Sequence, residues 1–331
     1  MASWCRRCAI FSVASMPERL GPPRDTPLVE RVALIGLGLI GSSIARAARH
    51  LNLARTIVAV DANEAVVARV RELGIADEAT TDIVAGVRNA DLVILCVPVG
   101  VCGKVAEAML SGLKPGSIVS DVGSVKASVV AQVQPHLPEG VHFVPAHPVA
   151  GTEHSGPDAG FSTLFHNRWC ILTPPEGTDE AAIERVRAFW EAMGSNVEVM
   201  TAQHHDLVLA ITSHVPHLIA YNIVGTAADL ETVTQGEVIK FSAGGFRDFT
   251  RIAASDPTMW RDVFLHNREA VLEMLGRLNE DIALLARAIR WGEGDKLFDL
   301  FTRTRAIRRG IISSGQETPE PDFGRRREDK V

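Results

Sequence analysis

Two residues near the middle of the chain, His147 and Ser124, are the strongest candidates for acid–base chemistry. His147 follows a predicted buried strand, between Ala146 and Pro148, and the proline restricts the backbone before it. Imidazole titrates near neutral pH, so it suits a general base that takes a proton from a hydroxyl group as hydride leaves the same carbon. Ser124 ends the neighbouring strand and can hydrogen-bond the imidazole or the hydroxyl. We predict that this pair is catalytic; the alternative is a capped surface histidine.

A second cluster of histidines and arginines lies further along the chain. His214 and His217 are three residues apart, so they share one side of a predicted helix. Pro216 removes a helix hydrogen bond and predicts a kink. Arg247 and Arg251 are candidate carboxylate clamps, because a planar guanidinium can bind a carboxylate through two hydrogen bonds. An interior, hydrogen-bonded histidine is an equally good interpretation of His214, as a local ion pair is of Arg247.

A glycine-rich turn at residues 36–41 indicates a cofactor site. It follows a strand-like run at 31–35 and opens a helix-like run that ends at about residue 50. Gly36 permits the tight turn, Gly38 lets the backbone approach a pyrophosphate, and Gly41 lets the helix pack close to the strand. The helix N-terminus favours phosphate. The motif alone is weak evidence, but strand, glycines and helix in this order are typical of dinucleotide binding.

Asp61 indicates which dinucleotide binds. It ends a second strand-like run, 56–60, and lies 20 residues past Gly41. Its carboxylate can accept hydrogen bonds from ribose hydroxyls and repels a 2′-phosphate, and Ala62 and Asn63 supply no cation, so NAD is favoured over NADP. We expect the cofactor to contact residues at the carboxyl ends of the strands: Gly36, Gly38, Leu39, Ile40, Gly41, Asp61, Val97, Pro98 and Asp121.

Alternating strand-like and helix-like runs predict the elements that position these residues: an α/β Rossmann-type doubly wound sheet followed by an all-α C-terminal domain. The expected strands lie at 31–35, 56–60, 91–97, 117–121, 141–144, 169–172 and 196–200, and the expected helices among them at 64–73, 101–110, 126–133 and 179–193. Beyond these we expect helices only, from Thr201 towards Ala228, from Asp256-Pro257 to about Ile289, and at 296–312.

We expect four parts along the chain: a flexible leader (1–29), a dinucleotide-binding domain (30–200), a helical substrate and dimerisation domain (201–313) and a disordered tail (314–331). Much apolar surface in the helical part suggests a homodimer that shares helices. Two domains also agree with the length of 331 residues.

Composition argues against several other classes of protein. A net charge of -6 argues against a nucleic-acid partner. No apolar run reaches the ~18 residues of a membrane helix. The five scattered cysteines are interpreted as free thiols in a reducing compartment, so a cytoplasmic location is expected. Cys5 and Cys8 have no second pair at zinc spacing, and His214 and His217 have no obvious third ligand, so we predict no metal.

Taken in order, five segments resemble the prephenate and arogenate dehydrogenases of tyrosine biosynthesis. They are residues 36–41, 121–126, 147–153, 213–217 and 246–251. The resemblance covers about residues 30–310 and implies a Rossmann domain, a helical dimerisation domain and NAD as cofactor. The reaction it implies is oxidative decarboxylation of prephenate to 4-hydroxyphenylpyruvate, of arogenate to tyrosine, or of both.

The same resemblance assigns roles to individual residues. His147 would contact the ring hydroxyl with help from Ser124, and Arg251 would bind a carboxylate. The residues expected at the substrate are His217, Arg251, Thr152, Glu153, Trp260, His214 and Arg247. Either Glu153 or Asp248 could pair with the ammonium group of arogenate, but the sequence places neither side chain, so the choice between the two substrates stays open.

Two alternatives remain. A β-hydroxyacid dehydrogenase shares a Rossmann domain followed by helices, but that family uses a lysine on a helix, and neither Lys240 nor Lys296 lies in a matching motif. A dinucleotide-sensing binding protein would not need His147, Ser124 and Arg251 together.

Overall fold

The computed structural model describes residues 20–152, 154–234, 240 and 243–313. Glu153 of the expected substrate site, most of the expected leader and the expected tail lie outside these residues. The chain divides into two compact units, residues 1–271 and 272–331. The helices between Thr201 and Val271 belong to the same unit as the sheet, whereas we predict a domain boundary at 200/201. That boundary stays a prediction.

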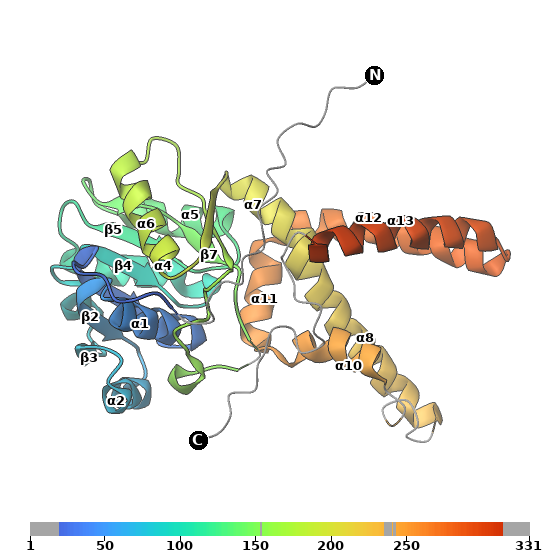
Figure 1. Cartoon of the computed structure of the whole chain (residues 1–331), viewed down its shortest axis with the longest axis horizontal. Helices are drawn as coiled ribbons and strands as arrows, with labels where there is room; N and C mark the ends of the chain where they lie inside the picture. Colours follow the sequence, from blue (N-terminus) through green and yellow to red (C-terminus); the bar gives the residue numbers. More distant parts are fainter. Residues whose placement is uncertain (1–19, 153, 235–239, 241–242, 314–331) are drawn as a thin grey trace. The chain divides into compact units, whose positions relative to one another are not determined.

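The main sheet has six parallel strands in the order β3-β2-β1-β4-β5-β6 (Figure 1). This order confirms the doubly wound sheet, and the order reverses between β1 and β4. The strands are β1 Val29–Ile35, β2 Ala54–Val60, β3 Glu78–Thr80, β4 Leu92–Leu95, β5 Ile118–Asp121 and β6 His142–Phe143. The sequence analysis missed β3, which has three residues and no apolar run.

Helices cover both faces of this sheet. They are α1 Leu39–Leu51, α2 Glu64–Leu73, α3 Ile83–Val87, α4 Cys102–Met109, α5 Ala127–Val133 and α6 Glu180–Ala192. Alternate side chains of β1 enter opposite cores: Val32 and Leu34 join the core with α1 and α6, and Ala33 and Ile35 join the core with α3, α4 and α5. Burial on both faces explains the continuous apolar runs.

A second sheet contains His147. Its strands are β7 Ala146–Pro148, β8 Trp169–Leu172 and β9 Asn196–Val199, with β7 antiparallel to β8 and β8 parallel to β9. His147 follows β6, as expected, but it also lies within β7, a strand that the sequence analysis missed. Because proline cannot donate to a ladder, it is tolerated on an edge strand, and β7 is the edge of this sheet.

The helical part of the first unit contains α7 Ala202–Leu209, the π-helix η5 Ala210–His214, α8 Val215–Thr234, α10 Gly244–Thr250, the 3-10 turn η6 Arg251–Ala254 and α11 Pro257–His266. The Thr201 side chain caps α7, as expected. The regular α-helix is interrupted before Pro216 by η5, which ends two residues before the proline; the expected kink itself stays a prediction. The expected helix from Pro257 to Ile289 is wrong, because α11 ends at His266 and a new helix begins after Asn267.

One helical tract, Ala202–Leu230, is long and apolar enough to cross a membrane by length and composition alone. This corrects the expectation that no such segment exists. The tract also carries the buried polar side chains His205, Asp206 and His214, which pack inside the first unit. Core helices of soluble proteins pass the same test, so length and composition alone are weak evidence for a membrane span.

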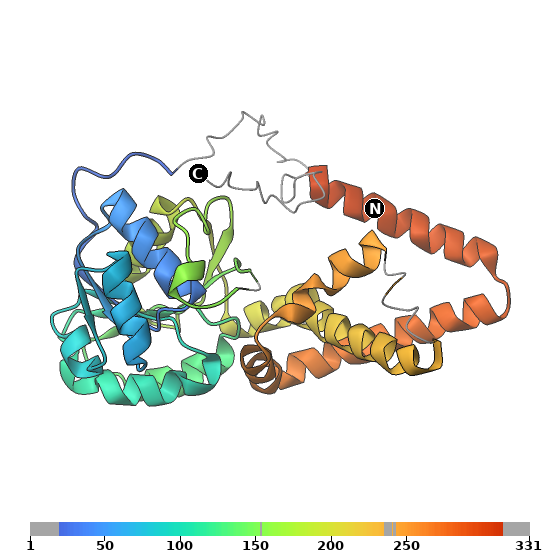
Figure 2. The ribbon, with the colours of Figure 1, turned by 90° about the horizontal axis from the view of Figure 1, so that it is seen from below.

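The second unit consists of two long helices, α12 Arg268–Arg290, which begins in the first unit, and α13 Gly294–Ser313. Figure 2 shows them joined by a tight turn, where Gly292 has a φ of 67°. Large apolar side chains on these helices are exposed: Leu272, Ile282, Leu284, Ile289, Phe298, Phe301 and Ile307.

Candidate active site

The glycine turn between β1 and α1 has the geometry that a dinucleotide requires. Gly36 has a φ of 97°, and a Cβ there would meet the carbonyl oxygen of Cys96 at 2.6 Å. A Cβ on Gly41 would collide with the carbonyl of Gly36. The space around Gly38, the residue just before α1, is open, and no acid or side-chain cap occupies the first turn of α1. The residues therefore fit a bound pyrophosphate.

Asp61 lies beside this turn. Its Oδ2 atom accepts a hydrogen bond of 2.9 Å from Leu37 N, and its Oδ1 accepts one of 3.0 Å from Asn63 N. Val97, from the loop after β4, also borders the turn, because its Cγ1 atom would lie 3.1 Å from a Cβ on Gly36. Since β1 and β4 pair in register at Ile35 and Leu95, both loops leave the same edge of the sheet.

We expect Asp61→Ala to bind NADP more tightly relative to NAD than the unchanged chain does. The substitution removes the charge that repels a 2′-phosphate and one acceptor for the ribose hydroxyls, each worth about 1–3 kcal/mol. Titration of both dinucleotides against both proteins measures the ratio. An unchanged ratio would show that Asp61 does not select the cofactor.

A fully buried ion pair lies at the carboxyl end of β5. Lys126 Nζ contacts Asp121 Oδ2 at 2.5 Å, and both side chains have no exposed surface. Lys126 Nζ also donates to Ala146 O at 2.7 Å, and Asp121 accepts from Gly123 N and Ala146 N. The pair therefore ties β5 to β7 one residue before His147. The Asp121 carboxylate, expected at the cofactor, instead faces Lys126 inside the protein.

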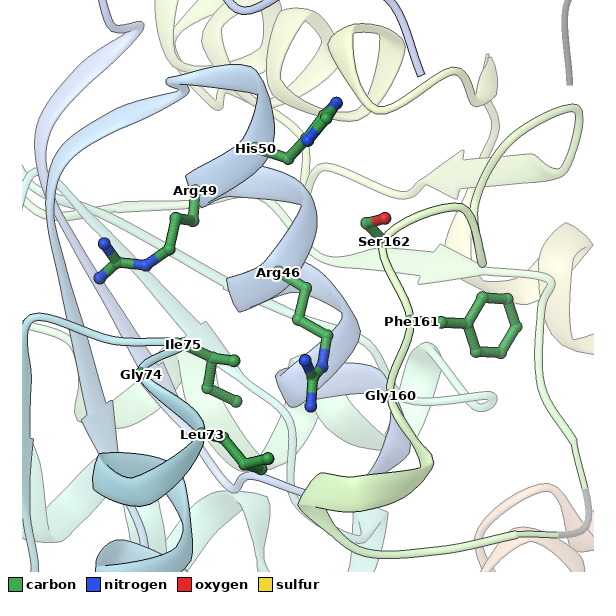
Figure 3. A pocket seen from close by; sticks show the side chains of 9 residues that line it. All are labelled: Arg46, Arg49, His50, Leu73, Gly74, Ile75, Gly160, Phe161 and Ser162. Carbon is green, nitrogen blue, oxygen red and sulfur yellow. The ribbon is translucent and has the colours of Figure 1, made fainter. Parts of the chain in front are cut away.

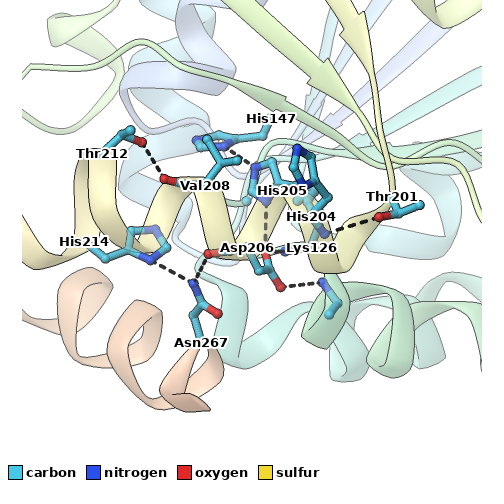
Figure 4. Close-up of polar contacts among 12 residues, drawn as sticks. Lys126, His147, Thr201, His204, His205, Asp206, Val208, Thr212, His214 and Asn267 are labelled. Carbon is cyan, nitrogen blue, oxygen red and sulfur yellow. Dashed lines mark hydrogen bonds and ion pairs between the residues drawn. The ribbon is translucent and has the colours of Figure 1, made fainter. Parts of the chain in front are cut away.

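His147 is 7% exposed, and its closest polar partner is a second histidine. Its Nδ1 atom lies 2.7 Å from Nε2 of His205, in α7 (Figure 4). The Nδ1 atom of His205 lies in turn 2.8 Å from Oδ1 of Asp206. Asp206 also accepts from Lys126 N, just before α5, and from Ala127 N, the first residue of α5. The expected contact of Ser124 with the imidazole is not among the described hydrogen bonds.

Sequence reasoning missed His205 and Asp206, although a signal exists. Both lie three or four residues before Leu209, so they share the inward face of α7. Polar side chains on a buried helix face need partners, and His147 and the start of α5 provide them. Asn267, at the break between α11 and α12, was also missed; its amide donates to Asp206 O at 2.8 Å and lies 3.0 Å from His214 Nδ1.

The second predicted cluster assembles around Trp260 of α11. His217 stacks on the indole with ring centroids 3.6 Å apart, and His214 meets it edge-on at 6.1 Å. His214 is fully buried, in agreement with an interior, hydrogen-bonded histidine. Arg251 lies close enough to His217 for its charge to lower the pKa of that histidine, after the larger effect of burial. The structure thus brings His217, Trp260 and Arg251 together.

Burial holds the central histidines in their neutral form. Desolvation lowers the pKa of His147 well below its usual value, and repulsion from His205 and His214, when those rings are protonated, and from Lys126 lowers it further. Burial also lowers the pKa of His205, against the opposing effect of Asp206, and that of His214 to about 4. A neutral imidazole is the form that can accept a proton.

The other expected residues lie around this centre or apart from it. Ser124, between β5 and α5, is half-buried, and its backbone lies near enough to His214 to oppose the fall of that pKa. Thr152 is half-buried and accepts from His154 N. Arg247 is exposed on α10, and no described hydrogen bond or ion pair links it to the cluster. Among the described residues, no group of three His, Cys, Asp or Glu side chains is arranged to hold a metal ion.

A hollow in the described surface lies away from this centre. It has a volume of about 500 Å³ and is lined by residues from α1, from the end of α2 and from the loop at 160–162 (Figure 3). These are Arg46, Arg49, His50, Leu73, Gly74, Ile75, Gly160, Phe161 and Ser162. None of them belongs to the predicted site.

Comparison with protein families finds two matches that follow one another along the chain. Residues 44–199 match the model described as prephenate dehydrogenase, nucleotide-binding domain, and residues 201–303 match prephenate dehydrogenase, dimerization domain. Among curated proteins, the cyclohexadienyl dehydrogenase of Zymomonas mobilis is 45% identical over 84% of this chain and 95% of its own. The prephenate dehydrogenase of Bacillus subtilis is 33% identical over 85% of this chain and 76% of its own.

Solved structures show the same likeness. Prephenate dehydrogenase from Aquifex aeolicus, in complex with hydroxyphenyl propionate and NAD+, superposes with a TM-score of 0.80 at 33% identity, over 85% of this chain and 98% of that one. Synechocystis arogenate dehydrogenase superposes with a TM-score of 0.72 at 26% identity, over 85% of this chain and 99% of that one. Both domains of the chain are therefore similar to proteins of one enzyme family.

Proposed function

The chain belongs to the prephenate dehydrogenase family, and from this we propose that it oxidises and decarboxylates prephenate, arogenate or both, with NAD as oxidant. It is an NAD-dependent oxidoreductase of tyrosine biosynthesis. The position of His147 is the main observation that supports a catalytic site in this chain. A buried ion pair ties that histidine to β5, one strand from β4, whose loop borders the dinucleotide turn.

In the proposed mechanism, His147 acts as general base through Nε2. No described residue hydrogen-bonds that atom, so it can accept the proton of the ring hydroxyl as hydride leaves the carbon that bears it. NAD, when bound, accepts that hydride. The ring carboxylate leaves as carbon dioxide, and the ring becomes aromatic. Ser124 supports the hydroxyl, and burial of His147 keeps water from competing for its lone pair.

The proposed substrate pocket uses His217, Trp260 and Arg251, with Thr152, Glu153, His214 and Arg247 as further expected contributors. The stacked rings of His217 and Trp260 offer a flat surface, and Arg251 beside them offers a guanidinium for a carboxylate. The hydroxyl of Tyr221 in α8 donates to Ser255 O at 2.6 Å, which anchors the end of the turn that carries Arg251.

We expect Arg251→Ala to raise the Michaelis constant for the substrate by about 10-fold or more, because a charge-assisted hydrogen bond contributes about 1.5–3 kcal/mol. The dissociation constant for NAD should stay the same. Steady-state kinetics with either substrate measures the change, and Arg88→Ala, at an exposed position after α3, is the matched control. An unchanged Michaelis constant in Arg251→Ala would count against the clamp.

The proposed function is tested by incubating the purified protein with NAD and either prephenate or arogenate and following NADH. NADH formation with at least one substrate supports it, and the ratio of the two kcat/KM values gives the preference, which the residues leave open. No NADH from either substrate would refute it. A β-hydroxyacid dehydrogenase would instead reduce NAD with a small hydroxy acid, and a dinucleotide sensor would bind NAD without turnover.

We propose that two copies of the chain pair through the helical region. The match to a dimerization domain supports this, as do the exposed apolar side chains of α12 and α13. Light scattering coupled to size exclusion should give twice the mass of 35.8 kDa. Phe298→Asp, at a 70% exposed position, should shift the mass towards one copy; a monomeric parent would contradict the proposal. A cytoplasmic location, in keeping with a biosynthetic role, stays a prediction.

A further inference from the structure

We propose that His205 and Asp206 are positioning residues that hold His147 in the tautomer whose Nε2 atom can accept a proton. The proposal rests on the proposed role of His147 as general base. It goes beyond that role, because it names two residues of α7 that lie away from the reacting atoms and act through His147.

The first step of the argument concerns Asp206. Its Oδ1 atom accepts from Lys126 N at 2.7 Å, and its Oδ2 atom accepts from Ala127 N at 2.9 Å. The carboxylate therefore caps the N-terminus of α5, where a negative charge is favoured. A carboxylate can only accept hydrogen bonds. The 2.8 Å contact between Asp206 Oδ1 and His205 Nδ1 must then place a proton on Nδ1 of His205.

The second step infers the tautomer of His147 from that of His205. A neutral His205 with its proton on Nδ1 has a lone pair on Nε2 and can only accept there. Burial of His205, which has no exposed surface, lowers its pKa and favours this neutral form. The 2.7 Å contact therefore needs a proton on Nδ1 of His147, and the Nε2 atom of His147 keeps its lone pair.

The third step concerns the charge that His147 gains when it accepts a proton. The protonated ring lies among positive or titratable groups: Lys126 before α5, His205 on α7 and His214 on η5. Asp121 on β5 and Asp206 on α7 carry negative charges, which act on the neighbouring ring of His205. The hydrogen bond from His147 Nδ1 to His205, with Asp206 behind it, is the described contact that stabilises the imidazolium directly. It offsets part of the cost of charging a buried ring.

The test compares His205→Phe with His205→Gln, and it uses His204→Gln as the matched control. His204 is the neighbouring histidine of α7, but it is exposed. Phenylalanine keeps the ring volume and removes the acceptor, whereas glutamine can still accept from His147. Nitrogen NMR of the full-length protein, labelled with ¹⁵N-histidine and saturated with NAD, reports which ring nitrogen of His147 carries the proton. Steady-state kinetics gives kcat, the Michaelis constant and the pH profile.

We expect His147 to carry its proton on Nδ1 in the unchanged protein and to lose this preference in His205→Phe. In that variant kcat should fall by about 10- to 100-fold with little change in the Michaelis constant. This fall is smaller than the one expected when the base His147 is itself replaced. The acid limb of kcat/KM should move to lower pH, because the imidazolium loses its acceptor. His205→Gln should retain more activity, and His204→Gln should match the parent.

Two results would overturn the proposal. One is a proton on Nε2 of His147 in the unchanged protein, or a tautomer that His205→Phe leaves as it was. The other is a changed tautomer with an unchanged kcat, which would also remove His147 from its proposed role as base. Because the NMR measurement needs no turnover, it separates a failure of the positioning role from a failure of the proposed function.

Discussion

His147→Asn should lower kcat by about 100-fold or more, because loss of a general base typically removes 10²–10⁴ of the rate. Asparagine is close to histidine in size and keeps a polar group beside His205, but it cannot take up a proton. The dinucleotide turn lies on other elements, so the dissociation constant for NAD should stay within about threefold of the parent. Initial rates of NADH formation and a fluorescence titration with NAD measure the two quantities.

The control for this variant is His136→Asn, the same substitution at an exposed position of the 3-10 turn Gln134–His136. It should turn over like the parent. Near-normal turnover in His147→Asn would remove this histidine from the mechanism. Loss of both NAD binding and turnover would indicate a folding defect, which thermal unfolding of both variants would reveal.

Lys126→Met should lower the free energy of unfolding by about 3–5 kcal/mol, because it leaves the carboxyl group of Asp121 buried without its cation. Burial raises the pKa of Asp121 and Lys126 opposes this, so loss of the lysine raises that pKa further. The substitution also removes the hydrogen bond from Nζ to Ala146 O. Because that bond holds the residue before His147, kcat should fall as well. Urea unfolding and NADH kinetics measure the two effects.

The chain offers a matched control in Lys114→Met. Lys114 pairs with Asp91 at 2.6 Å, but the two side chains are 38% and 22% exposed. A pair in contact with water contributes about 0–1 kcal/mol, so this variant should lose little stability. The double variant Asp121→Asn with Lys126→Met should recover part of the loss, since no buried charge remains. Equal losses at Lys114 and Lys126 would contradict the structural role of the buried pair.

The elements that the sequence predicted well are those whose local pattern decides their structure. The apolar run around β4 is buried on both faces, so it could only be an interior strand. The glycine turn is equally local, because its positive φ and close approaches arise within one strand, turn and helix. The caps Thr201 and Asp256 marked the starts of α7 and α11.

The parts that could not be predicted depend on contacts between distant segments. His147 and His205 are 58 residues apart, and only the packing of α7 against β7 brings their rings together. Asp121 and Lys126 are five residues apart, and nothing local indicates that they form a buried pair rather than a cofactor contact. The sequence analysis did not predict the strand β7, because Pro148 argues against a strand unless that strand lies at the edge of a sheet.

The measurement that tests the central claim most directly is the stoichiometry of one complete reaction. The purified protein is given excess NAD and a limiting amount of prephenate or arogenate, and NADH, carbon dioxide and the aromatic product are quantified together. Oxidative decarboxylation predicts one equivalent of each per substrate consumed. NADH without carbon dioxide, or a product that keeps its ring carboxylate, would contradict the account.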